Sequence, residues 1–296
     1  MKVIKLILTI TLFLPFVAAE EVYKGGVAAS STRNITERVE TFGFSFVRGW
    51  QLGGMPPTTQ GGVRYIPNLW CDNYSRVVDG EVVAMRDQLF LIDLLSSVDY
   101  DGYLLFLNEP DLSFYGRRGQ CEITPHGAAI LYMYTIGELP NAKLLGPGVS
   151  HIDYLNGWSW TMRFIEATIE LSGSPPDFYA WDFHTYLSTG PPLAVVDGLE
   201  YLLSMYGITN PIFTISEWGN CNPHRLIHMK ESFDNDERVY LHAVYLQEYA
   251  WWDGPGRCII FSEEGSSPLV ITQLGFAYKY GVVIDEVGVM RYNSKR

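Results

Sequence analysis

The sequence has 296 residues and a formal net charge of −12. This negative charge argues against a nucleic acid or an anionic membrane surface as the partner, and it is compatible with a neutral substrate. No repeat, low-complexity tract or linker divides the chain, which predicts one domain with one core.

Residues 1–19 have the form of a secretory signal peptide. Lys2 and Lys5 precede an apolar stretch at 6–17, and residues 17–19 offer small side chains for cleavage. A membrane anchor is the alternative, but the apolar stretch is shorter than the ~20 residues that span a bilayer. We therefore expect export, cleavage after Ala19, and a mature domain at 20–296 that is secreted and free of the membrane.

Alternating strand and helix patterns follow the signal peptide. Between the second and third strands, residues 51–62 contain several Gly and Pro pairs and are expected to form a loop. Helical spacing follows the third, fourth, fifth and seventh strands, at 85–97, 124–138, 162–171 and 237–252. The expected strands are residues 24–28, 44–50, 65–70, 103–107, 143–149, 178–184, 212–217 and 258–262.

This alternation indicates an α/β protein with a parallel sheet. Eight strands in one domain of this length favour a closed (β/α)8 TIM barrel over an open doubly wound sheet. A Gly-x-Gly-x-x-Gly motif, which would indicate a Rossmann domain, does not open the first unit.

Two glutamates stand at the ends of buried strands. Glu109 follows the fourth strand and Glu217 ends the seventh, and each is preceded by a near-continuous apolar run. In barrels of parallel strands, chemistry takes place at the carboxyl ends of the strands. Two carboxylates placed there are suited to the two-step hydrolysis of a glycosidic bond.

Other polar residues lie beside these glutamates. Asn108 is expected to donate from its amide to the sugar hydroxyl next to the reacting carbon. His184 and Tyr186 share a strand face by the two-residue period, so either can hydrogen-bond Glu217 and keep it ionised. A turn role for Asn108, and core roles for the other two residues, are the structural alternatives.

Tryptophans at strand ends are candidates for sugar stacking, because sugar rings present apolar C–H faces. Trp50, Trp70 and Trp218 follow or end strands and are expected to face the cleft, with core packing as the alternative. The chemistry predicted here needs no cofactor and no metal. The segment from His224 to His228 lacks the intervening glutamate of a zinc helix.

The expected export would bring the cysteines into an oxidising compartment, where disulfides can persist. Cys71 and Cys121 fall in loops at the same end of the predicted barrel, and a bridge between them is our hypothesis. Asn34 and Asn73 match the glycosylation acceptor pattern, and their use depends on the host.

The motifs resemble those of the clan A glycoside hydrolases, with Asn108-Glu109-Pro110 after strand four and Glu217-Trp218-Gly219 after strand seven. Within the clan, the chain is most similar to family 128, which acts on β-1,3-glucans. The segments that carry this similarity are 65–70, 107–112 and 182–186. The resemblance implies a retaining endo-β-1,3-glucanase with Glu109 as acid/base and Glu217 as nucleophile, acting on a polysaccharide or oligosaccharide as a monomer.

The chain departs from the family pattern at Thr185, where an aromatic residue is usual, and at Phe261, where a tryptophan usually closes strand eight. Because these positions concern the surface on which sugars stack, other specificities stay open. The alternatives are a clan A enzyme acting on xylan or mannan, an exo-acting enzyme, and a barrel that binds carbohydrate without turnover.

Overall fold

The structure is a computed structural model of the chain. The described residues are 25–29, 44–49, 64–70, 75–78, 81–114, 121, 123–150, 155–186, 189–220, 222–246, 261–262, 270–271, 282–284 and 290–292. The expected signal peptide and the loop at 51–62 lie outside them. Within the described part, no helix combines the length and apolar character needed to cross a bilayer.

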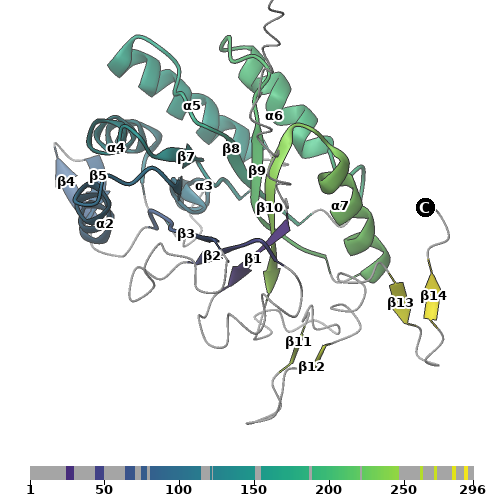
Figure 1. Cartoon of the computed structure of the whole chain (residues 1–296). Helices are drawn as coiled ribbons and strands as arrows, with labels where there is room; N and C mark the ends of the chain where they lie inside the picture. Colours follow the sequence, from purple (N-terminus) through teal and green to yellow (C-terminus); the bar gives the residue numbers. More distant parts are fainter. Residues whose placement is uncertain are drawn as a thin grey trace, which may run out of the picture.

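The main sheet has six parallel strands in the order β3-β2-β1-β10-β9-β8 (Figure 1). Its first strand in the chain therefore lies inside the sheet, between β2 and β10. The strands are β1 (Gly25–Ala29), β2 (Phe46–Gly49), β3 (Arg64–Ile66), β8 (Trp181–Thr185), β9 (Phe213–Trp218) and β10 (Val239–Leu246).

A second parallel pair, β6 (Tyr103–Leu105) and β7 (Lys143–Leu145), stands beside this sheet. Isolated parallel bridges join it to both ends of the main sheet, from Asn68 to Leu105 and from Leu145 to Ala180. Phe46, Ile66, Leu105, Leu145 and Leu241, which come from both sheets, pack in one buried cluster. The two sheets thus enclose a shared core, and the closed barrel stays a prediction.

Helices lie outside the strands (Figure 1). Two of them begin with a side-chain cap followed by proline: Thr124 Oγ1 accepts from the Gly127 N–H, and Asn222 Oδ1 accepts from the N–H groups of His224 and Arg225. Such caps satisfy amides that have no partner within the helix. The helices are α2 (Arg86–Ser96), α3 (Pro110–Phe114), α4 (Pro125–Glu138), α5 (Leu155–Ser172), α6 (Ala194–Ser204) and α7 (Pro223–Asn235).

Aromatic rings fill the layer between the second sheet and the helices. Phe106, Tyr132, Phe164 and Phe178 all contact one another, with ring centroids 5.1 to 6.2 Å apart. This packing fixes the strand that leads into Glu109 against α4 and α5.

The expected strands one to seven and the helices at 85–97, 124–138 and 162–171 are present. Their ends are shifted by a few residues, except that the third helix, α5, begins seven residues earlier, at Leu155. Three antiparallel pairs were not expected. They are β4 (Ser75–Val78) with β5 (Glu81–Met85), β11 (Phe261–Ser262) with β12 (Val270–Ile271), and β13 (Val282–Ile284) with β14 (Met290–Tyr292).

The predictions for the last unit are wrong. The segment 237–252, expected as a helix, contains β10, which pairs with β1 and β9. Of the expected strand 258–262, the described residues Phe261–Ser262 form β11, which pairs antiparallel with β12. Val239, Leu241, His242, Ala243 and Val244 are all buried, so both faces of β10 are covered. A short apolar run of this kind suits a helix or a buried strand equally, and strand partners distant in sequence decide between them.

Candidate active site

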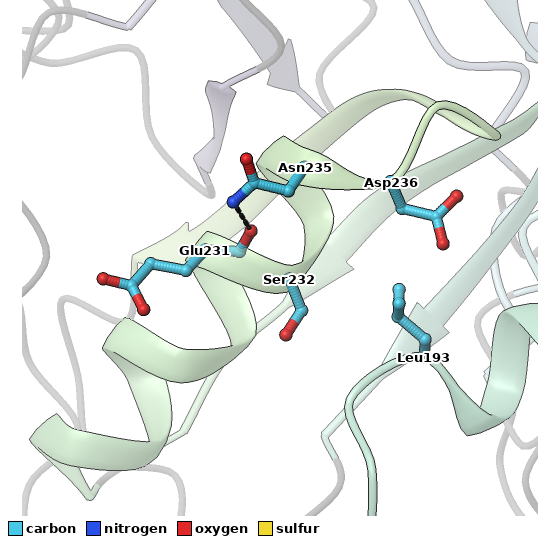
Figure 2. A pocket seen from close by; sticks show the side chains of 5 residues that line it. All are labelled: Leu193, Glu231, Ser232, Asn235 and Asp236. Carbon is cyan, nitrogen blue, oxygen red and sulfur yellow. Dashed lines mark hydrogen bonds between the residues drawn. The ribbon is translucent and has the colours of Figure 1, made fainter. Parts of the chain in front are cut away.

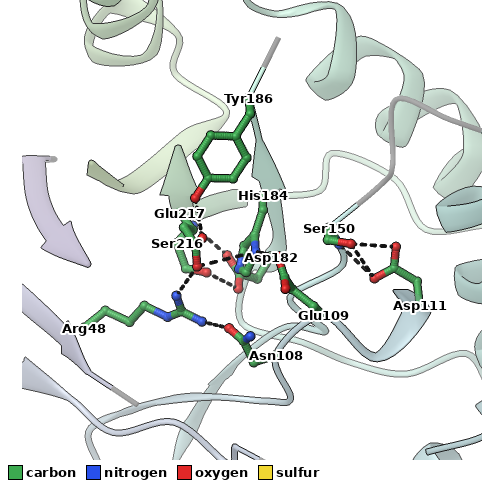
Figure 3. Close-up of polar contacts among 10 residues, drawn as sticks. All are labelled: Arg48, Asn108, Glu109, Asp111, Ser150, Asp182, His184, Tyr186, Ser216 and Glu217. Atoms are coloured by element: carbon green, nitrogen blue, oxygen red, sulfur yellow. Dashed lines mark hydrogen bonds and ion pairs between the residues drawn. The ribbon is translucent and has the colours of Figure 1, made fainter. Parts of the chain in front are cut away.

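The carboxylates of Glu109 and Glu217 meet at one end of the parallel strands (Figure 3). Glu109 follows β6, Glu217 lies in β9, and both are nearly buried, with exposed fractions of 9% and 6%. His184 of β8 stands between them, with Nδ1 at 3.1 Å from Glu109 Oε1 and 3.6 Å from Glu217 Oε2. The structure thus places three of the residues predicted for the site side by side.

Glu217 is surrounded by groups that favour its ionised form. Arg48 Nη1 donates to Oε2 at 2.7 Å, and the Tyr186 hydroxyl donates to Oε1. Burial alone would raise the pKa of Glu217, but the charges of His184 and Arg48 and the hydrogen bonds from Tyr186 and Arg48 outweigh it, so the pKa is lowered. A carboxylate held ionised in this way is available as a nucleophile at neutral pH.

Glu109 projects from an unusual stretch of backbone. Leu107 and Glu109 have φ angles of 65° and 48°, in the left-handed region that costs residues with a side chain roughly 1–2 kcal/mol each. The Glu109 N–H donates to the Gly148 carbonyl at 2.7 Å, which ties this segment to the chain after β7. The backbone turns here at the point where the carboxylate reaches His184, as expected for a strained functional position.

His184 is fully buried and joins the two glutamates. Burial lowers its pKa, but the charge of Glu217 and the hydrogen bond and charge of Glu109 outweigh this effect even against Arg48, so the pKa is raised. Because Nδ1 of His184 faces two carboxylates, we expect this nitrogen of the imidazole to carry a proton.

Arg48 was not identified from the sequence. It lies in β2, is 1% exposed, and donates from Nη2 to Asn108 Oδ1 as well as to Glu217. That bond orients the Asn108 side chain, so that its NH2 group is the end able to donate to a ligand. One feature of the sequence could have identified Arg48, since it is the single charged residue within the apolar strand expected at 44–50. A buried arginine requires an anionic or polar partner, so such a residue points to a polar site.

The three tryptophans expected to face the cleft have different positions. The prediction for Trp218 is wrong, because its side chain is fully buried, packs edge-on against Phe233 of α7, and donates from Nε1 to His242. Adjacent strand residues point to opposite faces, so Glu217 in the site places Trp218 toward the helices. Trp70 is partly exposed just after β3, and Trp50 lies outside the described residues.

One of the four cysteines lies among the described residues. Cys121 is fully buried and disulfide-bonded. Cys71, Cys221 and Cys258 lie outside the described residues, so the bridge from Cys71 stays a prediction. The acceptor positions Asn34 and Asn73 also lie outside them.

Within the described residues, the group able to offer ligand atoms to a metal is the site itself, since one such atom from each of Glu109, His184 and Glu217 lies within 4.8 Å of the others. Arg48 already places a positive charge 2.7 Å from Glu217. A cation here would be repelled by that charge, so the donor set fits an ion pair better than a metal centre.

A separate pocket on the surface shares no residue with this site (Figure 2). In it, the Asn235 side-chain amide donates to the Glu231 backbone carbonyl at 2.6 Å. Its lining consists of Leu193, Glu231, Ser232, Asn235 and Asp236.

Comparisons with known proteins point to one family. Residues 26–254 match the family model described as glycosyl hydrolase catalytic core. Comparison with curated proteins finds no match.

Solved structures with the same fold include enzymes and a binding protein. A family 128 (subgroup I) endo-beta-1,3-glucanase from Amycolatopsis mediterranei in complex with laminaritriose is 17% identical, with a TM-score of 0.59 over 86% of this chain and 98% of that one. A subgroup II endo-beta-1,3-glucanase from Sorangium cellulosum is 16% identical, with a TM-score of 0.59 over 87% and 98%. A subgroup VII oligosaccharide-binding protein from Cryptococcus neoformans is 17% identical, with a TM-score of 0.58 over 86% and 91%.

Proposed function

Because the chain belongs to the glycosyl hydrolase catalytic core family, we propose that it hydrolyses a β-linked glucan, β-1,3-glucan first, with retention of configuration. The observation that carries the proposal is the approach of Glu109 and Glu217, since one carboxylate oxygen of each lies within 4.8 Å of the other. Retaining enzymes hold their carboxyl groups ~5–5.5 Å apart, whereas inverting enzymes leave ~6.5–9.5 Å for a water. The distance therefore supports direct attack by a glutamate.

In this mechanism Glu217 attacks the anomeric carbon while Glu109 protonates the departing glycosidic oxygen. A covalent glycosyl ester on Glu217 results, and Glu109, now ionised, removes a proton from the water that hydrolyses the ester. The lowered pKa of Glu217 supports its role as nucleophile. His184 contacts both carboxylates and can stabilise whichever of them is charged at each step.

Substrate contacts are proposed for Asn108, His184, Tyr186 and Trp70. The amide of Asn108, oriented by Arg48, donates to the hydroxyl beside the reacting carbon, a bond that strengthens as charge develops in the transition state. Tyr186 is 46% exposed, so its ring is accessible to a sugar while its hydroxyl holds Glu217. The complex of the Amycolatopsis enzyme with laminaritriose supports a β-1,3-glucan as the ligand class.

A binding protein without turnover is the second candidate, favoured by the similarity to the oligosaccharide-binding protein from Cryptococcus neoformans. The contacts of Glu217 argue for the enzyme. A site that only binds sugar has no need of a buried carboxylate held ionised by Arg48, Tyr186 and His184.

The test is reducing-sugar release by residues 20–296 from laminarin, other β-glucans, xylan and mannan, with Glu217→Ala as the control. Release from laminarin that is lost in the variant supports the proposal. Release from another glycan alone would keep the mechanism and make that glycan the substrate. Binding of laminari-oligosaccharides without release by either protein would establish the binding protein instead.

Stereochemistry is tested in the same variant. Azide should restore activity to Glu217→Ala on a substrate with an acidic leaving group and give a glycosyl azide of inverted configuration, because a small anion replaces the missing nucleophile. The wild type should release a β-anomer first. An azide product of unchanged configuration would reject Glu217 as nucleophile.

We also propose that the two sheets form one closed (β/α)8 barrel in a single secreted, monomeric domain at 20–296. The bridges at Leu105 and Ala180 and the core cluster shared by both sheets support closure. Sedimentation of the exported chain checks the monomer, and mass spectrometry of its N-terminus checks cleavage after Ala19.

A further inference from the structure

A third carboxylate, Asp182 of β8, is buried beside the two glutamates (Figure 3). It is 2% exposed, two residues before His184, and the proposed hydrolysis assigns it no step. Burial of a carboxylate is unfavourable unless hydrogen bonds or a charge compensate for the lost water. The groups around Asp182 therefore indicate what it does.

Both oxygens of Asp182 bind one residue, Ser216. Oδ1 accepts from the Ser216 N–H at 2.9 Å, and Oδ2 accepts from its hydroxyl at 2.6 Å. Ser216 immediately precedes Glu217, so this two-point contact fixes the backbone from which the proposed nucleophile projects.

The strand pairing is irregular at this point. Asp182 pairs with Thr214 but His184 pairs with Glu217, so β9 advances by three residues while β8 advances by two. Such a bulge leaves an extra residue outside the ladder and redirects the following side chain. Asp182 supplies the acceptor for the N–H of Ser216, which lies within that bulge.

Asp182 also comes near the Nε2 atom of His184, whereas the glutamates face Nδ1. A β-carbon built on Gly148 would stand 2.9 Å from Asp182 Oδ2 and 3.5 Å from His184 Nε2, so both atoms border the same small space. The main charges acting on His184 are those of Glu217, Glu109 and Arg48, and the charges of His184 and Asp182 also act on each other. Burial raises the pKa of Asp182, and the charge of His184 is the main effect that opposes this rise.

We propose that Asp182 is a positioning residue for the nucleophile. It holds the bulge at Ser216 that directs Glu217 into the site, and its anion favours the protonated imidazole of His184. The inference rests on the proposed role of Glu217 in hydrolysis.

The experiment compares Asp182→Asn with a matched variant, Asp111→Asn. Asp111 makes the same kind of contact, with its carboxylate accepting from the N–H of Ser150 at 2.8 Å and from its hydroxyl. It is fully buried as well, so its variant measures what the loss of a buried carboxylate costs the fold. Each variant is assayed for thermal unfolding, for kcat and KM on laminarin, and for titration of ¹³C-labelled His184 by NMR.

Asp182→Asn should lower the titration midpoint of His184, because an anion that favours the imidazolium is removed. It should also reduce kcat roughly 10- to 100-fold with little change in KM, as expected for a misplaced nucleophile. Asp111→Asn should leave the His184 midpoint unchanged. An equal midpoint in the wild type and both variants would overturn the inference, as would equal losses of kcat in the two folded variants.

If Asp182→Asn does not fold, Ser216→Ala takes its place, because it keeps the backbone bond to Asp182 and loses the hydroxyl. Ser216→Ala should lower the His184 titration midpoint and kcat by less than Asp182→Asn does. An unchanged midpoint and an unchanged kcat would reject the inference. A wild type that hydrolyses no glycan would reject the proposed function, whereas the His184 titration would still test the effect of Asp182.

Discussion

At the scale of single residues, the site is organised by how each charge is compensated. Arg48, Tyr186 and His184 surround Glu217 with one ion pair, one hydroxyl donor and one imidazole. Glu109 instead has His184 as its side-chain partner and a backbone in the left-handed region. Two carboxylates in different surroundings can divide the roles of nucleophile and acid.

Glu109→Gln tests the acid role. Cleavage of laminarin should fall by roughly 10²–10⁴-fold, because the departing oxygen loses its proton donor. Aryl glycosides with acidic leaving groups need little protonation, so their first step should be largely spared. Glu166→Gln, at the surface contact with Tyr206, is the matched control. Equal losses on both substrates would remove Glu109 from this role.

Tyr186→Phe tests how the nucleophile is kept ionised. The hydroxyl donates to Glu217, and a donor favours the charged form, so its loss should raise the pKa of Glu217. The acidic limb of the pH profile of kcat/KM should then move to higher pH, with kcat reduced about 10- to 100-fold, as for the loss of a bond to a charged group. Tyr206→Phe, which loses a surface bond to Glu166, should leave the profile unchanged. A profile identical to the wild type would contradict the assignment.

Strand periodicity can predict which residues of one strand share a face, but it cannot predict contacts between residues that are distant in sequence. Periodicity placed His184 and Tyr186 on one face, and both reach Glu217. The same rule, applied to Glu217, would have turned Trp218 away from the cleft, where it packs against Phe233. Arg48 was missed because its partners, Asn108 and Glu217, are distant in sequence.

At the scale of elements, a polar contact between side chains joins α7 to β10. Asp234 Oδ1 lies 2.8 Å from His242 Nε2, and His242 Nδ1 accepts from Trp218 Nε1. This chain of contacts begins on α7, passes through β10 and ends next to Glu217 in β9.

Asp234→Asn should destabilise the fold by about 1 kcal/mol at pH 7, a value reduced for its partial exposure. Burial raises the pKa of Asp234, but His242 and Lys230 outweigh it and lower the pKa to about 2. The stabilisation is therefore present above the unfolded pKa of ~3.9 and is lost as pH falls through about 2. Urea denaturation at several pH values measures the difference between variant and wild type, which should shrink in acid.

Asp197→Asn is the control, since its bond to Arg238 involves a side chain that is 63% exposed. It should change stability by a few tenths of a kcal/mol, as exposed ion pairs do. An Asp234 variant no less stable than this control would show that the bond to His242 contributes nothing.

Helices with local signals could be predicted from the sequence, whereas β10, the last strand of the main sheet in chain order, could not. The cap at Thr124 followed by Pro125 marks the start of α4 within the sequence itself. β10 is specified by its pairing with β9 and with β1, which lies far earlier in the chain. Its own residues are apolar on both faces, so the local pattern could not separate strand from helix.

At the scale of the whole molecule, β1 lies inside the main sheet and pairs with both β2 and β10. A chain that starts at residue 30 lacks β1 and leaves both neighbours with unpaired edges. We expect it to lose cooperative thermal unfolding and to aggregate, as exposed edges do. Circular dichroism and size-exclusion chromatography measure this, with residues 20–296 as the control. A monomeric, cooperatively folded product would contradict the central place of β1.

The pairing of Gly25 with His242 has a consequence for biosynthesis. Residue 25 emerges from the ribosome long before residue 242 is synthesised. The nascent polypeptide therefore cannot complete the main sheet until most of the chain has been translated. Contacts between such distant residues form slowly, and until they form the chain stays extended and exposed to chaperones and proteases. For a protein expected to leave the cytoplasm, this delay is useful, because a translocation channel accepts a polypeptide that has not yet folded.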